Sequence, residues 1–453
     1  MSAASLGLAF DGRPLFAPKH THGLLLSAAG GGKTTCGVLP SLMSIIADTE
    51  RCVIVSDCKE GEIAAQAAAM CALYGRNVAV IDDFGIHGFD NPYAQPINPL
   101  GALVSAHAYA PSELNFTTDT ACQALIPEPR DDAKNQYFRD EPRTLIEFSS
   151  KMLLKRGLCT PGAVWSMIAH VDMLIQSAQV EAEEGDEDLQ ALAEHVLGMY
   201  DHEQFQMHRS AALKALRIYA SGSALHEAGV DATLTHEDLI REKYIIFITG
   251  PVRHMERLGP HYALHLQSFM EVVLTGKHGD VTFILDEFTN APLKALVSQL
   301  TTMRGYGANC LMIAQSYSEI ERKYGKLEAQ TILENAIIRQ WFGFSSYEEA
   351  EKVSRAMGET LGVSSNLGTS SDRAEFSATY STQKERLWTP DMLMRLPTDE
   401  QIIYIKGVGY IHCKKVAQNQ LAPYCHDLAP NPLEGGILPP DPLITLPVPG
   451  ERS

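Results

Sequence analysis

The sequence predicts an α/β fold: a nucleotide-binding domain built on a mainly parallel sheet, with an inserted all-helical domain. Three observations predict it. An apolar strand at residues 24–26 runs directly into a glycine-rich turn and a helix-compatible segment. Short apolar runs alternate with helix-compatible segments up to residue 105 and again from residue 237. Between them, residues 106–236 keep a helical period and contain no strand-like run. Such alternation is typical of a parallel sheet covered by helices on both faces.

The glycine-rich turn has the composition of a phosphate-binding loop. Its candidate binding residues are Ser27, Ala28, Ala29, Gly30, Gly31, Gly32, Lys33, Thr34 and Thr35. Glycines let successive backbone N–H groups face an anion, and the following helix adds the positive end of its dipole. In this pattern Lys33 reaches the β- and γ-phosphates, and the hydroxyl of Thr34 binds Mg²⁺. The full pattern has glycine where this chain has Ser27. The alternative interpretation is an ordinary glycine turn between a strand and a helix.

The remaining elements continue the alternation. Strands are expected at residues 52–57, 77–82, 244–248, 281–285, 310–314 and 337–344, and helices at 35–48 and 62–74. Near the end of the chain, residues 402–405 are expected to pair with 410–413 across Gly407-Val408-Gly409. Continuous apolar strands of this kind indicate burial on both faces of a sheet.

Composition divides the chain into five segments. These are a lead-in (1–20), the first part of the nucleotide-binding domain (21–105), the helical insertion (106–236), the second part of the nucleotide-binding domain (237–422) and a proline-rich tail (423–453). The Ser/Thr-rich stretch 363–384 predicts a mobile loop, and the proline density of the tail predicts an extended segment without a packed element. The acidic run 181–188 indicates a solvated face or turn, with a docking surface for a basic partner as the alternative.

Charge and cysteine content narrow the class of protein. The formal net charge of −18 excludes a chain that coats its whole surface in nucleic acid, so any DNA contact must be local. The nine cysteines form no Cys-x-x-Cys pair and fit small buried side chains in a reducing compartment. No run approaches the roughly 18 apolar residues of a membrane span, and residues 1–20 lack the features of a signal peptide. We therefore expect a soluble, cytoplasmic chain.

A second motif predicts hydrolysis of the bound nucleotide. The apolar run 283–285 ends in two adjacent carboxylates, Asp286 and Glu287. We expect Asp286 to lie beside the metal and hold a Mg²⁺-bound water. Glu287 is expected to polarise the water that attacks the γ-phosphate.

Two further polar residues are catalytic candidates. Gln315 ends the next strand, where a side chain can sense the γ-phosphate or orient water. The alternative for Gln315 is a strand-end amide with its hydrogen bonds satisfied. Arg304 lies on the link between the two strands. In a ring of subunits it can stabilise charge on a neighbour's nucleotide, and a salt-bridged structural arginine is the alternative.

Several stretches resemble the coupling proteins of type IV secretion and bacterial conjugation, the TraG/TraD-like family. They are Asp57-Cys58-Lys59-Glu60-Gly61-Glu62, Asn98-Pro99-Leu100, the segment 285–325 and the segment 386–397. The resemblance implies a RecA-like P-loop domain with an all-helical insertion, assembled as a homo-hexamer. It implies ATP and Mg²⁺ as cofactors, and it assigns the nucleotide chemistry to Lys33, Thr34, Asp286, Glu287 and Gln315.

The resemblance also implies a function and partners. ATP hydrolysis would drive single-stranded DNA with its attached relaxase, or an effector protein, toward a secretion channel. The DNA contact would not depend on base sequence. Most members begin with transmembrane helices and this sequence shows none, so attachment at the inner membrane would need channel subunits as partners. Two alternatives stay open: a nucleotide-binding adaptor that recruits protein substrates without acting as a motor, and a soluble DNA-processing ATPase of the same branch.

Overall fold

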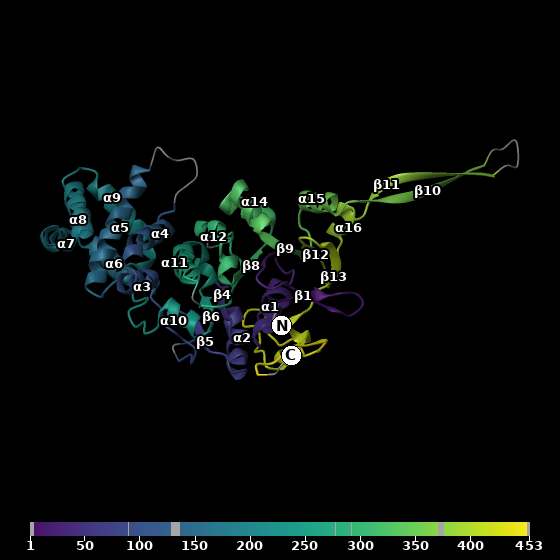
Figure 1. Cartoon of the computed structure of the whole chain (residues 1–453), viewed down its shortest axis with the longest axis horizontal. Coiled ribbons are helices and arrows are strands. Elements are labelled where there is room, and N and C mark those ends of the chain that lie inside the picture. Colours follow the sequence, from purple (N-terminus) through teal and green to yellow (C-terminus); the bar gives the residue numbers. More distant parts are fainter. Residues whose placement is uncertain are drawn as a thin grey trace.

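The computed structural model describes residues 4–88, 90–127, 136–276, 278–290, 292–369 and 376–450. The molecule is elongated, with a layer of helices at one end, a sheet covered by helices in the middle and a two-stranded ribbon at the other end (Figure 1). Within the described residues, none of the helices combines the length and apolar character that a bilayer span requires.

The central sheet has eleven strands in the described part of the chain. Its strands are β1 (Ser5–Leu8), β2 (Pro14–Phe16), β3 (His22–Leu26), β4 (Cys52–Asp57), β5 (Val78–Ile81), β6 (Ile245–Thr249), β7 (Val281–Leu285), β8 (Ala308–Ala314), β9 (Ala336–Trp341), β12 (Glu400–Ile405) and β13 (Gly409–Lys414). Their order is β2-β1-β13-β12-β9-β3-β8-β7-β4-β6-β5. From β9 to β5 all pairings are parallel, and from β12 to β2 they are antiparallel. The predicted pairing of 402–405 with 410–413 is confirmed.

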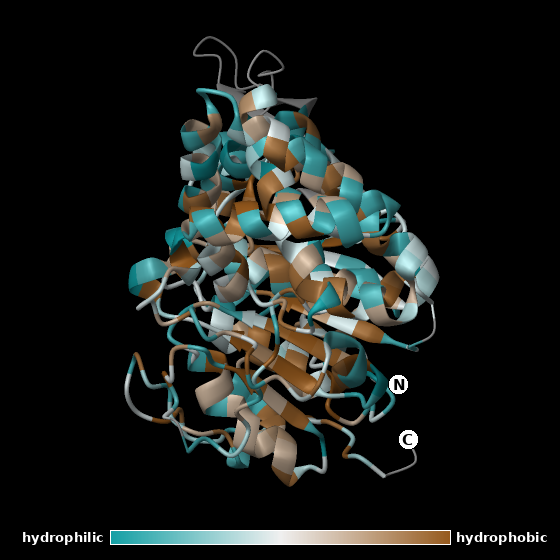
Figure 2. Ribbon diagram, turned by 90° about the vertical axis from the view of Figure 1, so that its left-hand side faces the viewer, coloured by the Kyte–Doolittle hydropathy of each residue, from teal (hydrophilic) through white to brown (hydrophobic). Residues whose placement is uncertain are grey.

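Alternate residues of each central strand pack against different helical layers. Leu25, Val53 and Val55 face α1 (Leu39–Ile45) and α2 (Glu62–Leu73). Leu24 and Ile54 belong to the larger apolar cluster on the other face, which includes α11 (Met255–Leu274). Both faces are therefore buried, which explains why these strands are continuous apolar runs. Figure 2 shows the strands as a largely hydrophobic interior between helices whose outer surfaces are hydrophilic.

Further helices lie in the second half of the described chain. They are α12 (Lys294–Gln299), α13 (Tyr317–Tyr324), α14 (Lys326–Asn335), α15 (Tyr347–Met357) and α16 (Pro390–Met394). Among them, α13 contacts β8 and α14 contacts β9.

The helical layer is formed by consecutive helices. They are α3 (Gly101–Tyr109), α4 (Leu114–Leu125), α5 (Tyr137–Lys155), α6 (Pro161–Ala169), α7 (Val171–Glu184), α8 (Glu187–Tyr200), α9 (Phe205–Ala215) and α10 (His236–Arg241). The acidic run 181–188 covers the last turn of α7, the two residues between the helices and the start of α8. The side chain of Asp186 caps α8 by accepting a hydrogen bond from the N–H of Leu189. Glu181 differs from the rest of the run, because its buried carboxylate accepts a hydrogen bond from Lys155 Nζ at 2.7 Å.

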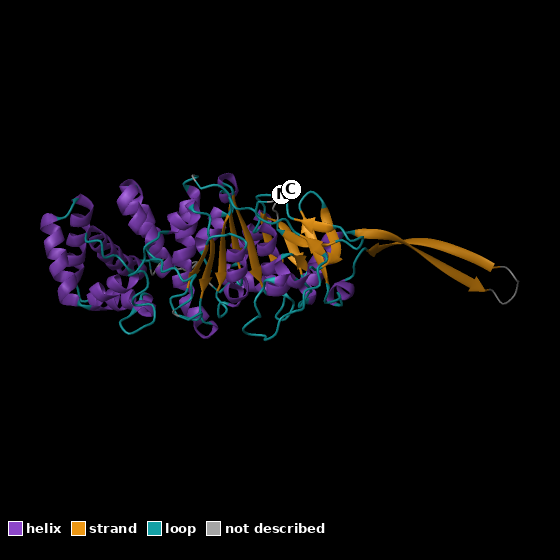
Figure 3. Cartoon of the chain, turned by 90° about the horizontal axis from the view of Figure 1, so that it is seen from below, coloured by secondary structure: helices purple, strands orange, loops and turns teal. Residues whose placement is uncertain are grey.

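Two stretches expected to be irregular are strands. Instead of a mere lead-in, residues 5–8 and 14–16 extend the sheet beyond β13. The mobile loop predicted over 363–384 is wrong for the described residues there: β10 (Glu359–Thr369) and β11 (Phe376–Arg386) pair as an antiparallel ribbon, and residues 370–375 lie outside the description. Figure 3 shows this ribbon projecting from the body. A strand pair that does not pack on a hydrophobic core does not need alternating apolar residues. The sequence pattern that usually indicates a strand is therefore missing here.

The proline-rich tail packs against the body rather than extending away from it. Its strand β15 (Ile444–Thr445) pairs with β14 (Leu421–Ala422). Ile444 and Leu446 are buried in the same apolar cluster as α1 and α2. The prediction of a tail without a packed element is therefore wrong, because single apolar side chains between prolines bury themselves without forming a long element.

Candidate nucleotide-binding site

The glycine-rich turn follows β3 at the edge of the sheet where the parallel strands end. The N–H of Ser27 still belongs to the sheet, because it donates to the carbonyl of Ala314 at the end of β8 (3.1 Å). Gly30 and Gly32 have φ angles of 74° and 89°, which side chains with a Cβ rarely adopt. A Cβ on Gly31 would lie 2.2 Å from the Ser27 hydroxyl. These residues therefore have to be glycine for the loop to close.

The predicted binding residues differ in exposure along this loop. Ser27 is buried, whereas Ala28, Ala29 and Gly30 are exposed at its tip. Lys33, Thr34 and Thr35 open one turn of π-helix, Lys33–Val38, which continues as α1. These three residues are partly buried and form the start of the helix, whose N-terminal N–H groups favour an anion. A π-turn inside a helix is frequent at functional sites.

The structure brings the acid pair to this loop. Asp286 and Glu287 follow β7, which is separated from β3 only by β8. Lys33 Nζ lies 3.3 Å from Glu287 Oε1, and both side chains are mostly buried. The second oxygen of Glu287 accepts a hydrogen bond from Asn290 Nδ2 at 2.8 Å. Glu287 has a φ of 47°, a conformation that stores strain and is found at functional sites.

Asp286 is a buried carboxylate whose negative charge and hydrogen-bonding capacity are only partly satisfied. Burial and the negative charge of Glu287 raise its pKa to about 7, although Lys33 acts in the opposite direction. Its Oδ1 has no hydrogen-bond partner among the described residues. A buried oxygen of this kind is costly unless a ligand satisfies it. Carboxylate and hydroxyl oxygens, as on Asp286 and Thr34, are donors of the kind that Mg²⁺ prefers.

A second pair of buried carboxylates lies at the end of β4 and the start of α2. Glu62 Oε1 accepts a hydrogen bond from Thr34 Oγ1 at 3.1 Å, and Lys59 Nζ lies 3.2 Å from the same oxygen. Asp57 accepts the N–H groups of Ile63 and Ala64 at 2.9 and 2.7 Å. Sequence reasoning quoted both acids for family resemblance without placing them in the site. The available signal was that β4 neighbours β7, so both strands end at the same edge.

Gln315 lies at the same end of the parallel strands as the glycine-rich turn, and its expected role toward the γ-phosphate stays a prediction. It follows β8, and its exposed side chain lies outside the Lys33–Glu287 pair. Its backbone N–H donates to Glu319 Oε2 at 3.3 Å, next to the Ser316 side chain that caps α13. Gln315 is therefore an exposed residue at the end of the strand next to β3.

Arg304 lies at the opposite end of the parallel strands. It precedes β8, and its Nε donates to the carbonyl of His20, which precedes β3, at 3.0 Å. Because β3 and β8 are parallel, the amino ends of both strands lie far from the loop that follows Leu26. The exposed Arg304 is thus not part of the site of its own chain.

Lys415 contacts the glycine-rich turn, and the sequence did not predict this contact. It follows β13, and its Nζ donates to three carbonyls: Gly31 at 3.1 Å, Phe342 at 3.0 Å and Thr398 at 2.9 Å. The ammonium also lies 4.7 Å from the centre of the Phe342 ring. One lysine thereby fixes the glycine turn to two other loops. Nothing in the local sequence signals this contact, because it joins residues far apart in the chain.

Known proteins resemble this chain in sequence. Residues 6–431 match the family described as type IV secretory system conjugative DNA transfer. The protein VirD4 of Rhizobium radiobacter is 25% identical over 288 residues, which cover 62% of this chain and 42% of VirD4. The conjugal transfer protein TraG of Escherichia coli is 27% identical over 151 residues, which cover 29% of this chain and 24% of TraG. The chain therefore matches less than half the length of either relative.

Solved structures share the fold. The bacterial conjugative coupling protein TrwBdeltaN70 in its unbound form superposes with a TM-score of 0.66 at 14% identity, over 92% of this chain and 89% of that chain. The plasmid coupling protein TrwB in complex with ADP and Mg²⁺ gives a TM-score of 0.62 at 15% identity, over 88% and 86%. This likeness confirms the predicted α/β class with a helical part. Because the family match spans most of its length, the chain belongs to the type IV secretory system conjugative DNA transfer family.

Proposed function

We propose that this protein is an ATP-hydrolysing coupling protein that moves DNA, with an attached relaxase, or an effector protein toward a type IV secretion channel. The observation that carries the proposal is the approach of Lys33 Nζ to Glu287 Oε1 at 3.3 Å, beside the unsatisfied oxygen of Asp286. This arrangement supports the proposal, because Lys33 would serve as the phosphate-binding cation, Glu287 as the general base and Asp286 as a metal-binding carboxylate. Family membership and the nucleotide complexes of TrwB support the choice of ATP and Mg²⁺.

The side chains have distinct roles in this proposal. Lys33 exchanges its contact with Glu287 for a phosphate oxygen when nucleotide binds. Glu287 is then free to orient a water and accept its proton. Thr34 and Asp286 would hold Mg²⁺, which compensates phosphate charge when bound. The backbone N–H groups of the glycine turn bind the remaining phosphate oxygens.

Arg304 completes the proposal at a subunit boundary. Arg304 lies at the amino ends of β3 and β8, too far to contact a nucleotide on the glycine-rich turn of its own chain. Its side chain is exposed and is therefore available to a neighbouring copy in a ring. We propose a homo-hexamer in which each Arg304 faces the nucleotide of the next subunit. Mixing Arg304→Ala with Lys33→Ala subunits should restore part of the activity that each variant lacks alone, because some boundaries then contain both intact residues. Mixtures no more active than the separate variants would contradict action between subunits.

ATP turnover is the decisive test of the motor. Phosphate release is measured for the purified chain with and without single- and double-stranded DNA, alongside its mass in solution. We expect DNA to stimulate turnover, and Glu287→Gln to lower it by at least about 100-fold while fluorescent ATP analogues still bind. Glu334→Gln, which changes an exposed glutamate on α14, is the matched control and should leave turnover unchanged. Nucleotide binding without turnover in the wild-type chain would instead indicate an adaptor.

A further inference from the structure

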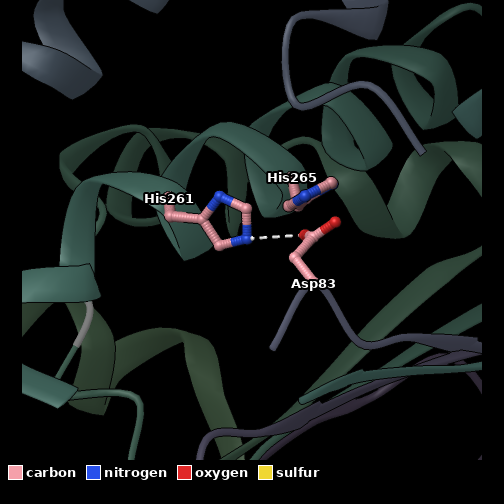
Figure 4. A group of neighbouring side chains, drawn as sticks. All are labelled: Asp83, His261 and His265. Atoms are coloured by element: carbon pink, nitrogen blue, oxygen red, sulfur yellow. Dashed lines mark ion pairs between the residues drawn. The ribbon is translucent and has the colours of Figure 1, made fainter. Parts of the chain in front are cut away.

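A group of buried metal-binding side chains lies outside the nucleotide site. It consists of Asp83, His261 and His265, and one ligand atom of each residue lies within 4.8 Å of the others (Figure 4). Asp83 follows β5, the last strand at its end of the sheet. The two histidines lie on α11, four residues apart, and therefore on the same face of the helix. The fold thus brings a strand end and a helix face together around three potential ligands.

One nitrogen in this group has no partner. His261 Nε2 lies 3.1 Å from Asp83 Oδ2, and the side chains of these two residues are 1% and 11% exposed. His265 is completely buried, and its Nε2 has no hydrogen-bond partner in the described part of the chain. Leaving a buried polar atom unsatisfied costs free energy. Because a ring nitrogen of His265 also lies within 4.8 Å of the ligand atoms of Asp83 and His261, the group indicates a missing ligand.

The opposite ring nitrogens of both histidines are already engaged. His261 Nδ1 lies 3.1 Å from the hydroxyl of Tyr219, and His265 Nδ1 lies 3.1 Å from His236 Nε2. Metal-binding histidines show this arrangement: one nitrogen contacts a supporting group, which orients the ring, and the other faces the metal.

We infer that Asp83, His261 and His265 bind one divalent transition-metal ion. Two imidazole nitrogens and one carboxylate oxygen suit Zn²⁺, whereas Mg²⁺ prefers oxygen donors alone. This chemistry separates the group from the oxygen donors at Thr34 and Asp286. Three protein ligands leave a fourth position for water.

The location indicates a structural role for the ion. Tyr219 and His236 belong to the segment between β5 and β6 that forms the helical layer, whereas Asp83 is attached directly to the sheet. The helix α11 carries both histidine ligands and contacts α3, α4 and α10. An ion bound by Asp83 and α11 would therefore connect the end of the sheet to the helices that pack on it. We expect its binding to stabilise the folded chain, since a ligand that binds only the native state does so by mass action.

Zinc binding to the full-length chain tests the inference. The protein is stripped with a chelator, dialysed and titrated with Zn²⁺ against a chromophoric competitor in millimolar Mg²⁺. We expect one Zn²⁺ to bind per chain despite the excess Mg²⁺, and the midpoint of thermal unfolding to rise. Substitution with Co²⁺ should give visible absorption bands of a nitrogen- and oxygen-ligated ion. Absence of stoichiometric binding would overturn the proposal.

Variants localise the ion. Asp83→Asn and His265→Gln keep the approximate size of each side chain. Each should weaken Zn²⁺ binding by about 10- to 100-fold. His208→Gln is the matched control: His208 is equally buried, on α9, but packs against Tyr137 and Phe138. Equal affinity in the wild type, both ligand variants and the control would refute the assignment. Should the ligand variants fail to fold, the wild-type Co²⁺ spectrum decides, because a spectrum without nitrogen ligation excludes this site.

Discussion

Thr34 Oγ1 donates a hydrogen bond to Glu62 Oε1 at 3.1 Å, which joins the helix start after the glycine-rich turn to the first residue of α2. Glu62 is only 1% exposed, and its other oxygen accepts a hydrogen bond from Asn431 Nδ2 at 3.1 Å. Burial raises the pKa of Asp57 well above its usual value, and the charges of Glu62 and Asp286 raise it further. The charge of Glu62 also raises the pKa of Asp286. A cation beside Thr34 would relieve the repulsion between these charges. The structure thus contains more negative charge around the proposed metal than the acid pair alone supplies.

Replacing Glu62 with glutamine should weaken the metal-dependent part of nucleotide binding. The variant keeps an oxygen for Thr34 but removes one negative charge from the surroundings of the cation. Mg²⁺ should increase the affinity for a fluorescent ADP less in the variant than in the wild type. We expect this increase to be about tenfold smaller, equivalent to about 1.4 kcal/mol. Titrations with Mg²⁺ and with EDTA measure this difference. Glu60→Gln is the control, since Glu60 contacts the N–H of Val252 instead of the loop. An unchanged Mg²⁺ effect in Glu62→Gln would contradict this role.

Lys415 should act as a positioning residue for the glycine turn. Lys415→Met removes its hydrogen bonds to the carbonyls of Gly31, Phe342 and Thr398 while retaining most of the apolar stem. Because a loosened turn must be ordered before it binds phosphates, we expect nucleotide affinity to fall about tenfold. Equilibrium titration with a fluorescent nucleotide measures it. Lys414→Met changes the exposed neighbouring lysine and should leave the affinity as it is. If both variants bind like the wild type, the contact does not preorganise the loop.

The parallel part of the fold could be predicted because its strands are buried on both faces. Such strands appear as continuous apolar runs, as in Val53 to Val55, and single residues such as Gly31 mark the turn that follows. The ribbon of β10 and β11 could not be predicted in this way, since a strand pair projecting from the body carries no such signal. The packed tail was missed because its core contacts are isolated residues such as Ile444.

The site could be predicted where its residues follow strands or glycines. Lys33 and Glu287 meet because parallel strands of one sheet have their carboxyl ends on the same side, and only β8 separates β3 from β7. Lys415 and the Asp83 group could not be found, because their contacts depend on how distant loops and helices pack. For Arg304, the sequence predicted that it precedes β8. That this position lies at the amino ends of the parallel strands, far from the glycine-rich turn, could be known only once the directions of the strands were known.

Glu271 should make the stability of the protein depend on pH. Burial raises the pKa of this α11 carboxyl from 4.5 to about 7, although a hydrogen bond from Gln267 opposes the shift. In the unfolded chain the group ionises from about pH 4.5, so the free energy of unfolding should fall as the pH rises toward 7. Glu271→Gln removes this loss. At pH 8 we expect the variant to be more stable by up to about 3 kcal/mol, with little difference at pH 4.

Urea unfolding at pH 4, 6 and 8 measures the pH dependence of Glu271. Glu256→Gln on the same helix is the control, because Glu256 is exposed and its removal should not alter the pH profile. The decisive quantity is the difference in unfolding free energy between each variant and the wild type. A difference for Glu271→Gln that stays constant from pH 4 to pH 8 would show that the carboxyl ionises normally in the folded chain.

Ile444 should contribute to the stability of the nucleotide-binding core although it lies in the proline-rich tail. It is 6% exposed, pairs with Leu421 across β14 and β15, and packs in the cluster of α1 and α2. Ile444→Ala leaves a cavity there, so we expect it to lower the free energy of unfolding by about 2–4 kcal/mol. Leu443→Ala, at a 57% exposed neighbour, should change it by less than about 0.5 kcal/mol. Urea unfolding followed by fluorescence compares the two. Equal and small effects would mean that the tail detaches in solution, because a detached Ile444 leaves no cavity when it is shortened.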